Sequence, residues 1–222
     1  MKFLLKFLNY VSKGYSPCKI YQIEEFKKLK LKKKIIEFGT NYYEESFTKL
    51  IRNRSKQIFF SNIKKNNNKN YIQINLEKKN KINKKFENAI VFNVLEHVYD
   101  NGNALDQIKK ILKKDGIIYI STPFIYRYHK ATEDYNRYTI PYFEKILKEK
   151  NFKIIEKKNL GEGPFMASYS LLHDYLKRIP LISYPIVIIC YLFDKILSLF
   201  HKKNIKKFYP ICILIIAKKR TN

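Results

Sequence analysis

The sequence contains no tryptophan and only three cysteines, Cys18, Cys190 and Cys212, among its 222 residues. These cysteines have neither the paired spacing of a disulfide framework nor the short repeats of a zinc module. We therefore expect no disulfide scaffold, and we assign no residue as a metal ligand. Unpaired cysteines also favour a reducing, cytoplasmic compartment.

Acidic residues and arginine are scarce as well. Lys and Arg number 45 against 19 Asp and Glu, a net charge of +26, yet only 6 of the 45 are arginine. High positive charge is typical of nucleic-acid binding, but arginine is the residue best suited to bidentate contacts with bases and phosphates. We therefore interpret the charge mainly as a solvated lysine surface, and nucleic-acid binding is the less favoured alternative.

The N-terminus lacks the features of a secretory signal. Lys6 interrupts the first apolar run, and no small-residue cleavage site follows it. Apolar residues from Phe3 to Val11 recur at helical spacing, which predicts an amphipathic helix. Packing of this helix on the domain is the simpler interpretation, and a helix on a membrane surface is the alternative.

Short apolar runs alternate with helical patterns from residue 35 onward. Asp100 or Asn101 is expected to cap one of the helices, and Gly116 to end it in a left-handed conformation. The alternation predicts an α/β fold, a doubly wound and mostly parallel sheet with helices on both faces. The strand-like segments are 35–39, 58–60, 71–76, 88–94, 116–121, 152–156 and 211–216, and helices are expected over 43–54, about 101–115 and 139–147.

Residues 160–208 break this alternation with an apolar stretch that is densest over 179–193. Fifteen residues reach about 22 Å as a helix, short of the ~30 Å core of a bilayer. Pro180 and Pro185 interrupt the run and Asp194 closes it. The segment predicts a helical apolar insert before the last strand. Partial immersion in an anionic membrane surface is the alternative, because basic residues flank the run at Lys177, Arg178, Lys195, Lys202 and Lys203.

Three segments carry a resemblance to a known family: FNVLEHV at 92–98, IKKILKKDG at 108–116 and ISTPF at 120–124. Their order and spacing resemble the class I S-adenosylmethionine-dependent methyltransferases, and within them the methyltransferase type 11 branch. Residues 129–139 are similar to a signature that follows strand five in bacterial members, some of them surface-polysaccharide enzymes. The resemblance covers about residues 35–160.

The resemblance implies a Rossmann-like methyltransferase fold with seven strands, the seventh antiparallel and inserted beside the sixth. We expect a single domain over 1–222, with a helical N-terminal extension over 1–34 and the apolar insert over 160–208.

The family's cofactor-binding positions can be transferred residue by residue. Glu37 and Gly39 match the acidic, glycine-containing turn after strand one. Asn62 and Asn75 stand where the family usually has carboxylates for the ribose and the adenine, and an asparagine hydrogen-bonds without the charge-assisted component. The expected cofactor-binding set is Glu37, Gly39, Asn62, Asn75, Leu76 and Asn93.

The resemblance implies S-adenosylmethionine as the cofactor and methyl transfer to a small-molecule, glycan or lipid-linked acceptor. His129 and Asp134 are the candidate catalytic residues, because a hydroxyl acceptor gains from a general base within reach. The alternative is a methyltransferase-like protein that has lost cofactor binding and serves as a membrane-surface or partner-binding protein. The expected place is the cytoplasm or the inner face of the membrane.

Overall fold

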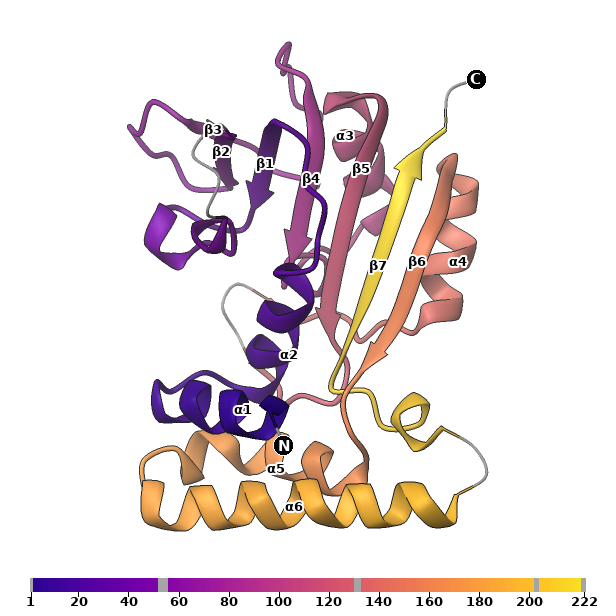
Figure 1. Cartoon of the computed structure of the whole chain (residues 1–222). Coiled ribbons are helices and arrows are strands. Elements are labelled where there is room, and N and C mark those ends of the chain that lie inside the picture. The colour runs from indigo at the N-terminus through magenta and orange to yellow at the C-terminus, as the bar shows by residue number, and fades with distance from the viewer. Residues whose placement is uncertain (1, 52–55, 130–132, 202–203, 221–222) are drawn as a thin grey trace. The chain divides into compact units, whose positions relative to one another are not determined.

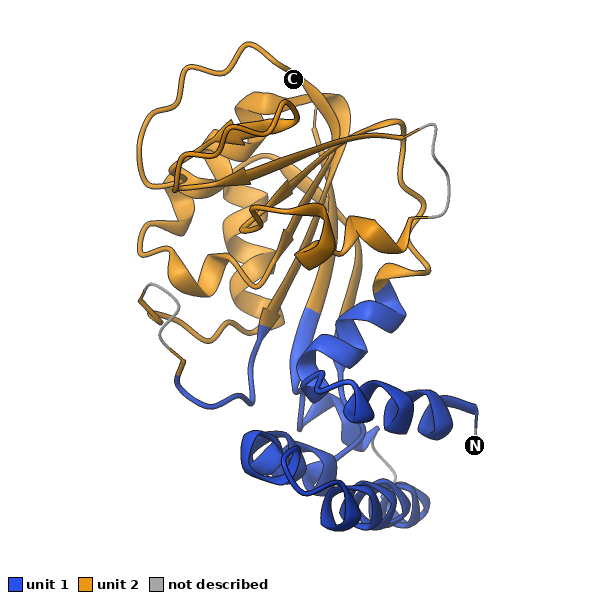
Figure 2. Ribbon diagram, turned by 90° about the vertical axis from the view of Figure 1, so that its left-hand side faces the viewer, with its two compact units in different colours: residues 1–25, 123–128, 159–213 blue, residues 26–122, 129–158, 214–222 orange. Residues whose placement is uncertain are grey.

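The structure is a computed structural model that describes residues 2–51, 56–129, 133–201 and 204–220. These residues form two compact units, which are described separately (Figure 2). Unit 1 comprises residues 1–25, 123–128 and 159–213, and unit 2 comprises residues 26–122, 129–158 and 214–222. The assignment of 1–222 to a single domain stays a prediction.

The sheet has seven strands in the order β3-β2-β1-β4-β5-β7-β6. β1 pairs in parallel with β2 and β4, β2 with β3, and β4 with β5. β7 lies between β5 and β6 and runs opposite to both (Figure 1). The mostly parallel sheet and the place of the last strand are therefore confirmed. The strands are β1 Lys34–Phe38, β2 Gln57–Asn62, β3 Tyr71–Gln73, β4 Phe86–Phe92, β5 Leu112–Pro123, β6 Phe152–Leu160 and β7 Cys212–Lys219.

The centre of the sheet is β4, whose apolar run needs cover on both faces. Ala89, Ile90 and Val91 are fully buried in it. Among the helices of unit 2, α3 (Asn101–Ile111) buries Leu105 and Ile108, and α4 (Ile140–Glu149) buries Phe143 and Leu147. The carboxylate of Asp100 accepts a hydrogen bond from the backbone N–H of Asn103 at 2.9 Å, which confirms Asp100 as the cap of α3.

Two local predictions are wrong. The left-handed residue after α3 is Asp115, with φ +58°, and not Gly116. Two short 3₁₀ turns, η1 (Tyr43–Glu45) and η2 (Thr48–Leu50), replace the helix expected over 43–54, of which residues 52–55 lie outside the described ranges. The reason is Glu37, whose carboxylate accepts hydrogen bonds from the backbone N–H groups at 47 and 48 and so competes with a helical ladder.

Unit 1 is built mainly from helices (Figure 1). α1 buries Phe7 and Val11, as the apolar spacing predicts, and it contacts α6. The ring of Phe3 lies 5.6 Å from that of Tyr21 and 6.4 Å from that of Tyr191 on α6. The helices are α1 Lys2–Ser12, α2 Pro17–Phe26, α5 Pro164–Leu176, α6 Pro180–Phe200 and the short η4 Ile205–Lys207.

α6 is longer than the sequence pattern predicts. It continues through Pro185 and Asp194 for 21 residues, or about 31 Å. Asp194 does not close the run, because its side chain turns inward: the two carboxylate oxygens accept hydrogen bonds from the backbone N–H groups of Phe165 and Met166 at 3.0 and 2.9 Å. Asp194 thereby satisfies two open donors at the start of α5. Among the described residues, α6 is the one helix long and apolar enough to cross a membrane.

We predict that Asp194→Ala lowers the free energy of unfolding by about 2 kcal/mol, because two backbone donors, one buried and one partly buried, lose their carboxylate acceptor. The matched control is Asp106→Ala, since Asp106 also lies inside a helix but makes a half-exposed ion pair with Lys150; this change should cost less than about 1 kcal/mol. Urea unfolding of both variants makes the comparison. Equal losses would show that Asp194 does not hold α5.

Candidate functional site

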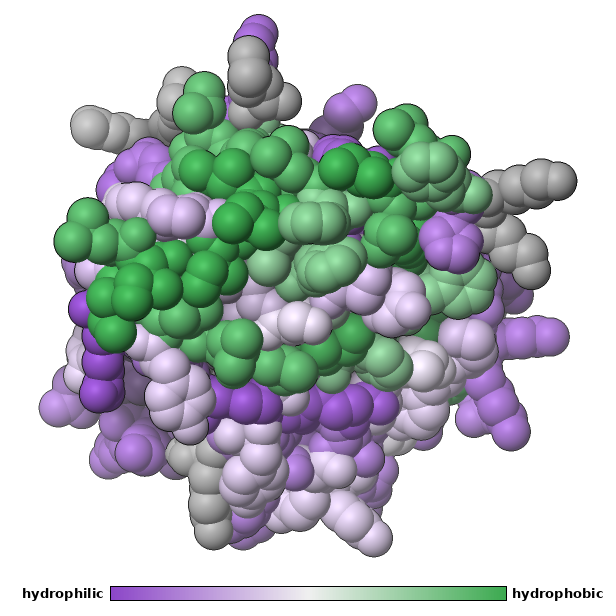
Figure 3. All heavy atoms as spheres, turned by 90° about the horizontal axis from the view of Figure 1, so that it is seen from below, coloured by the Kyte–Doolittle hydropathy of each residue, from purple (hydrophilic) through white to green (hydrophobic). Residues whose placement is uncertain are grey.

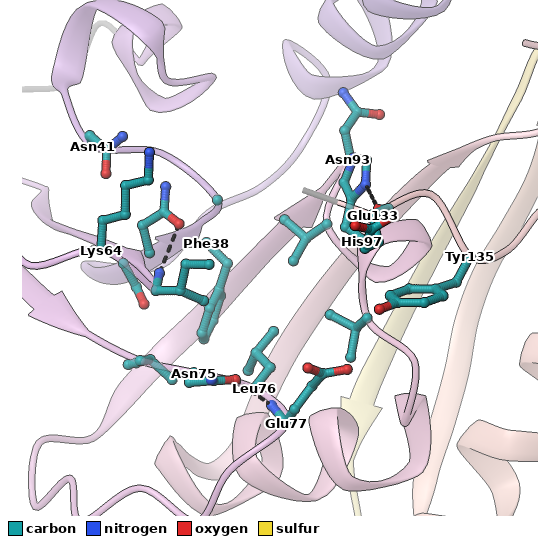
Figure 4. A pocket seen from close by; sticks show the side chains of 17 residues that line it. Phe38, Asn41, Lys64, Asn75, Leu76, Glu77, Asn93, His97, Glu133 and Tyr135 are labelled. Carbon is teal, nitrogen blue, oxygen red and sulfur yellow. Dashed lines mark hydrogen bonds between the residues drawn. The ribbon is translucent and has the colours of Figure 1, made fainter. Parts of the chain in front are cut away.

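A cleft of about 360 Å³ opens in unit 2 where β1, β2 and β4 end (Figure 4). In open parallel sheets, ligands bind outside these carboxyl ends, near the point where the strand order reverses. Here that point lies between β1 and β4. The volume is within the range of small-molecule sites, about 300–1,000 Å³.

Gly39 is the first residue after β1, and it lines the cleft. It adopts φ +78°, and its N–H donates to the carbonyl of Ser61 at 2.8 Å. A Cβ at this position would lie 2.7 Å from Cγ2 of Val94, closer than any ordinary contact. The turn therefore requires glycine on two grounds, conformation and space.

Asn93 follows β4 and also has a left-handed backbone, with φ +55°. Its N–H donates to the carbonyl of Ser121 on β5 at 2.8 Å. Asparagine is one of the few residues that adopt this conformation at low cost. Asn93 consequently turns the chain sharply at the strand end, and it lines the cleft.

Asn62 and Asn75 line the same cleft, after β2 and β3. Each side-chain oxygen accepts a hydrogen bond from a following backbone N–H, that of Ile63 at 2.7 Å and that of Glu77 at 2.9 Å. These bonds fix both amides in place, and Leu76 adds an apolar wall. The structure thus brings Gly39, Asn62, Asn75, Leu76 and Asn93 to one cleft, and their contact with a cofactor stays a prediction.

Glu37 is a correction to the expected set. It is not among the residues that line the cleft. Its carboxylate is buried and accepts the N–H groups of Phe47 and Thr48 at 2.7 and 3.0 Å. Glu37 therefore acts by holding the η1–η2 segment beside the cleft.

His129 and Asp134 do not line the cleft either. Asp134 accepts two hydrogen bonds from the Arg137 guanidinium and one from the N–H of His129. The Arg137 guanidinium holds the pKa of Asp134 down at about 2, too low for a general base near neutral pH. Asp134 holds its own loop through these bonds, and the catalytic roles expected for Asp134 and His129 stay predictions.

Sequence reasoning missed several residues of the cleft. Glu77 lies two residues beyond Asn75, and its carboxylate accepts the N–H of Tyr99 at 2.8 Å. Glu133 and Tyr135 come from the loop after β5, next to Asp134 in sequence. His97 comes from the turn after β4, a strand end where the sequence already favours a site, and it lines the cleft as well. The sequence signal that could have identified Glu77 is an acidic residue shortly after the end of a strand, where ligands bind in parallel sheets. Asn41 and Lys64 complete the polar part of the wall.

The comparisons with known proteins find methyltransferases, both by sequence and by structure. A family model described as methyltransferase domain matches residues 18–157. No curated protein matches the chain at a significant level.

Solved structures share the fold at low sequence identity. An S-adenosylmethionine-dependent methyltransferase from Mesorhizobium loti has 11% identity and a TM-score of 0.56, with 94% of this chain and 100% of that one covered. A methyltransferase solved with the Trm112 activator of Haloferax volcanii has 9% identity and a TM-score of 0.57, with coverage of 91% and 90%. A 1,6-didemethyltoxoflavin-N1-methyltransferase from Burkholderia thailandensis, bound to 1,6-didemethyltoxoflavin and S-adenosylhomocysteine, has 11% identity and a TM-score of 0.51, with coverage of 86% and 72%.

The chain belongs to the methyltransferase domain family. It is an enzyme, a class I methyltransferase, and S-adenosylmethionine is its cofactor. The expectation drawn from the resemblance is confirmed at this level.

The residues of the cleft fit this cofactor. The backbone at Gly39 is open for close approach, because no side chain can stand there. The amides of Asn62 and Asn75 supply hydrogen-bonding groups for hydroxyl and amino groups. Ile74 and Leu76 supply apolar walls of the kind that take a flat ring.

We predict that Asn62→Asp and Asn75→Asp each tighten the binding of S-adenosylmethionine by roughly 1 kcal/mol, about fivefold in Kd, because a charge-assisted bond replaces a neutral one. Isothermal titration calorimetry measures the change. Asn204→Asp is the matched control, since Asn204 lies in unit 1 and its side chain accepts a hydrogen bond that Asp retains. Unchanged affinity in both cleft variants would show that neither position touches the cofactor.

Proposed function

We propose that this methyltransferase works at an anionic membrane surface and methylates a lipid-linked acceptor. The observation that carries the proposal is the exposed apolar face of α5 and α6 in unit 1. Figure 3 shows apolar side chains gathered over these helices. We call this set of side chains the apolar face; it consists of Phe165, Leu171, Leu172, Tyr175, Ile179, Leu181, Ile182, Ile189, Leu192, Phe193, Ile196, Leu199 and Phe200.

The exposure of this face is unusual for a protein in water. Leu181, Leu199 and Phe200 are 89%, 82% and 79% exposed. Single apolar residues on a surface need no explanation, but a continuous patch of this kind marks an interaction site.

α6 has the character of a helix that lies in an interface. One side of it buries Ser183, Val187, Tyr191 and Asp194 against a unit that includes α1 and α5. The opposite side carries most of the apolar face. Because the buried side bears a carboxylate that holds α5, the arrangement favours a helix lying along the membrane plane over one that crosses it.

Charge supports an anionic membrane as the partner. Unit 1 contains twelve Lys and Arg against five Asp and Glu. Lys195 and Lys206 contact the Glu162 carboxylate at 3.1 and 2.7 Å, so their charges are partly compensated. Lys202 and Lys203, which the sequence pattern places at the edge of the face, lie outside the described residues. Each basic residue near an anionic surface contributes about 1 kcal/mol of attraction.

The bound cofactor supplies a methyl group already activated on a sulfonium, so the protein chiefly aligns the acceptor. An acceptor attached to a lipid would share the membrane with the enzyme. A glycan hydroxyl on a lipid carrier is the acceptor that agrees with both the membrane location and the similarity of residues 129–139 to polysaccharide enzymes. The proposed place of action is the inner face of the membrane.

We predict that the protein sediments with vesicles of phosphatidylcholine and phosphatidylglycerol and is released only partly by high salt, because salt screens charge but leaves apolar burial intact. The double variant Leu181→Glu, Leu199→Glu should lower the partition coefficient at least about tenfold, since each leucine contributes roughly 1.5–3 kcal/mol when buried. Ile155→Glu, at an exposed apolar position on β6, is the matched control and should bind as the wild type does.

Three outcomes would contradict the proposal. In the first, the wild type stays in the supernatant. In the second, light scattering shows a stable dimer, whose interface would cover the apolar face. In the third, alkaline carbonate fails to extract the protein, as expected if α6 spans the membrane.

The acceptor is tested separately with S-adenosylmethionine labelled in its methyl group and a membrane lipid extract. Label in the butanol phase supports a lipid-linked acceptor, and label only in soluble sugars contradicts it.

A further inference from the structure

Three side chains with metal-binding atoms meet beside the cofactor cleft in unit 2. They are Glu96 and His97, from the 3₁₀ turn η3 (Leu95–His97) after β4, and His129, from the segment after β5. One ligand atom from each lies within 4.8 Å of the other two. The proposed work at a membrane surface gives this cluster no role as a metal site.

Glu96 is the unusual member. Its side chain is 0% exposed, and neither carboxylate oxygen accepts a hydrogen bond from another described residue. The nearby Arg137 guanidinium is engaged by Asp134. A buried carboxylate without donors is costly, so the site is built for a positive partner that these side chains do not supply.

Oxygen atoms lie close to Nδ1 of both imidazoles, and at His97 the contact is a hydrogen bond. Nδ1 of His97 lies 2.5 Å from the carbonyl oxygen of Glu133, to which it donates (Figure 4). This leaves the lone pair on Nε2, which lies 3.9 Å from Oε1 of Glu96. Nδ1 of His129 lies 3.5 Å from Oδ2 of Asp134. A hydrogen bond from one ring nitrogen to a carbonyl, as at His97, is the usual way that proteins orient a histidine ligand.

We propose that Glu96, His97 and His129 bind a divalent transition-metal ion at the edge of the cofactor cleft. Two neutral imidazoles and one carboxylate suit ions such as Zn²⁺, Fe²⁺ or Mn²⁺. Metal–ligand bonds of 2.0–2.2 Å place tetrahedral ligands about 3.4 Å apart, so the cluster needs to contract by roughly 1 Å from its present spread of up to 4.8 Å.

The place of the ion gives it a role in recognition of the acceptor. His97 lines the cleft, and three protein ligands leave coordination positions open. An oxygen of the acceptor is the ligand that such a position takes, and coordination lowers the pKa of a bound hydroxyl. The inference concerns unit 2 alone and does not depend on the membrane proposal.

The test is metal binding by the full-length protein after treatment with EDTA. Equilibrium dialysis against Zn²⁺ or Mn²⁺, followed by elemental analysis, should give one ion per chain, and the ion should raise Tm because it binds only the folded state. His97→Ala and Glu96→Gln should weaken binding by about 100-fold or more. His201→Ala is the control, since His201 is exposed at the end of α6 and outside the cluster.

Glu96→Gln also separates binding from folding. In EDTA this variant should melt at or above the Tm of the wild type, because it removes a buried carboxylate without donors. It should lose the increase in Tm that the metal causes. Wild-type protein that retains no ion after dialysis, or variants of the cluster that bind as tightly as His201→Ala, would overturn the proposal.

Discussion

The cleft depends on the close approach of the chain after β1 to the chain after β4. Gly39 and Val94 come so near that a single added methyl group would lie 2.7 Å from the valine. Both chains turn at a left-handed residue, Gly39 and Asn93. Parallel pairing of β1 with β4 brings these turns to one edge. A compact turn on each strand then leaves room for a small molecule where bulkier turns would fill the space.

The loop after β5 is attached to the turn after β4. The backbone N–H groups of Tyr135 and Asn136 donate to the carbonyl of Glu96, and the hydroxyl of Tyr138 donates to that of Leu95 at 3.2 Å. Asp134 and Arg137 stiffen the same loop from within. This network holds the loop to the turn after β4. It positions Glu133 and Tyr135 at the cleft, and it brings His129 to His97.

The sequence predicts the sheet well because periodic apolar runs decide it. The buried β4 and the capped α3 follow directly from residue type and spacing. Local sequence patterns do not predict the effect of a single side chain that hydrogen-bonds to a segment far away in the sequence. Glu37 has the right residue type for a ligand contact, yet its carboxylate replaces the expected helix with two 3₁₀ turns. Asp194 looks like the polar end of an apolar run, but a tertiary partner, the start of α5, keeps it inside α6. In both cases the deciding hydrogen bonds join segments that local patterns treat separately.

The central claim is that the cleft after β1, β2 and β4 binds the methyl donor, and calorimetric titration of the wild-type protein with S-adenosylhomocysteine tests it most directly. The demethylated product has the same adenosine and amino-acid parts and does not react during the measurement. The account predicts one equivalent bound in the micromolar range, with binding lost in Gly39→Ala. No heat of binding at millimolar ligand, from protein shown to be folded by its circular dichroism, would contradict it.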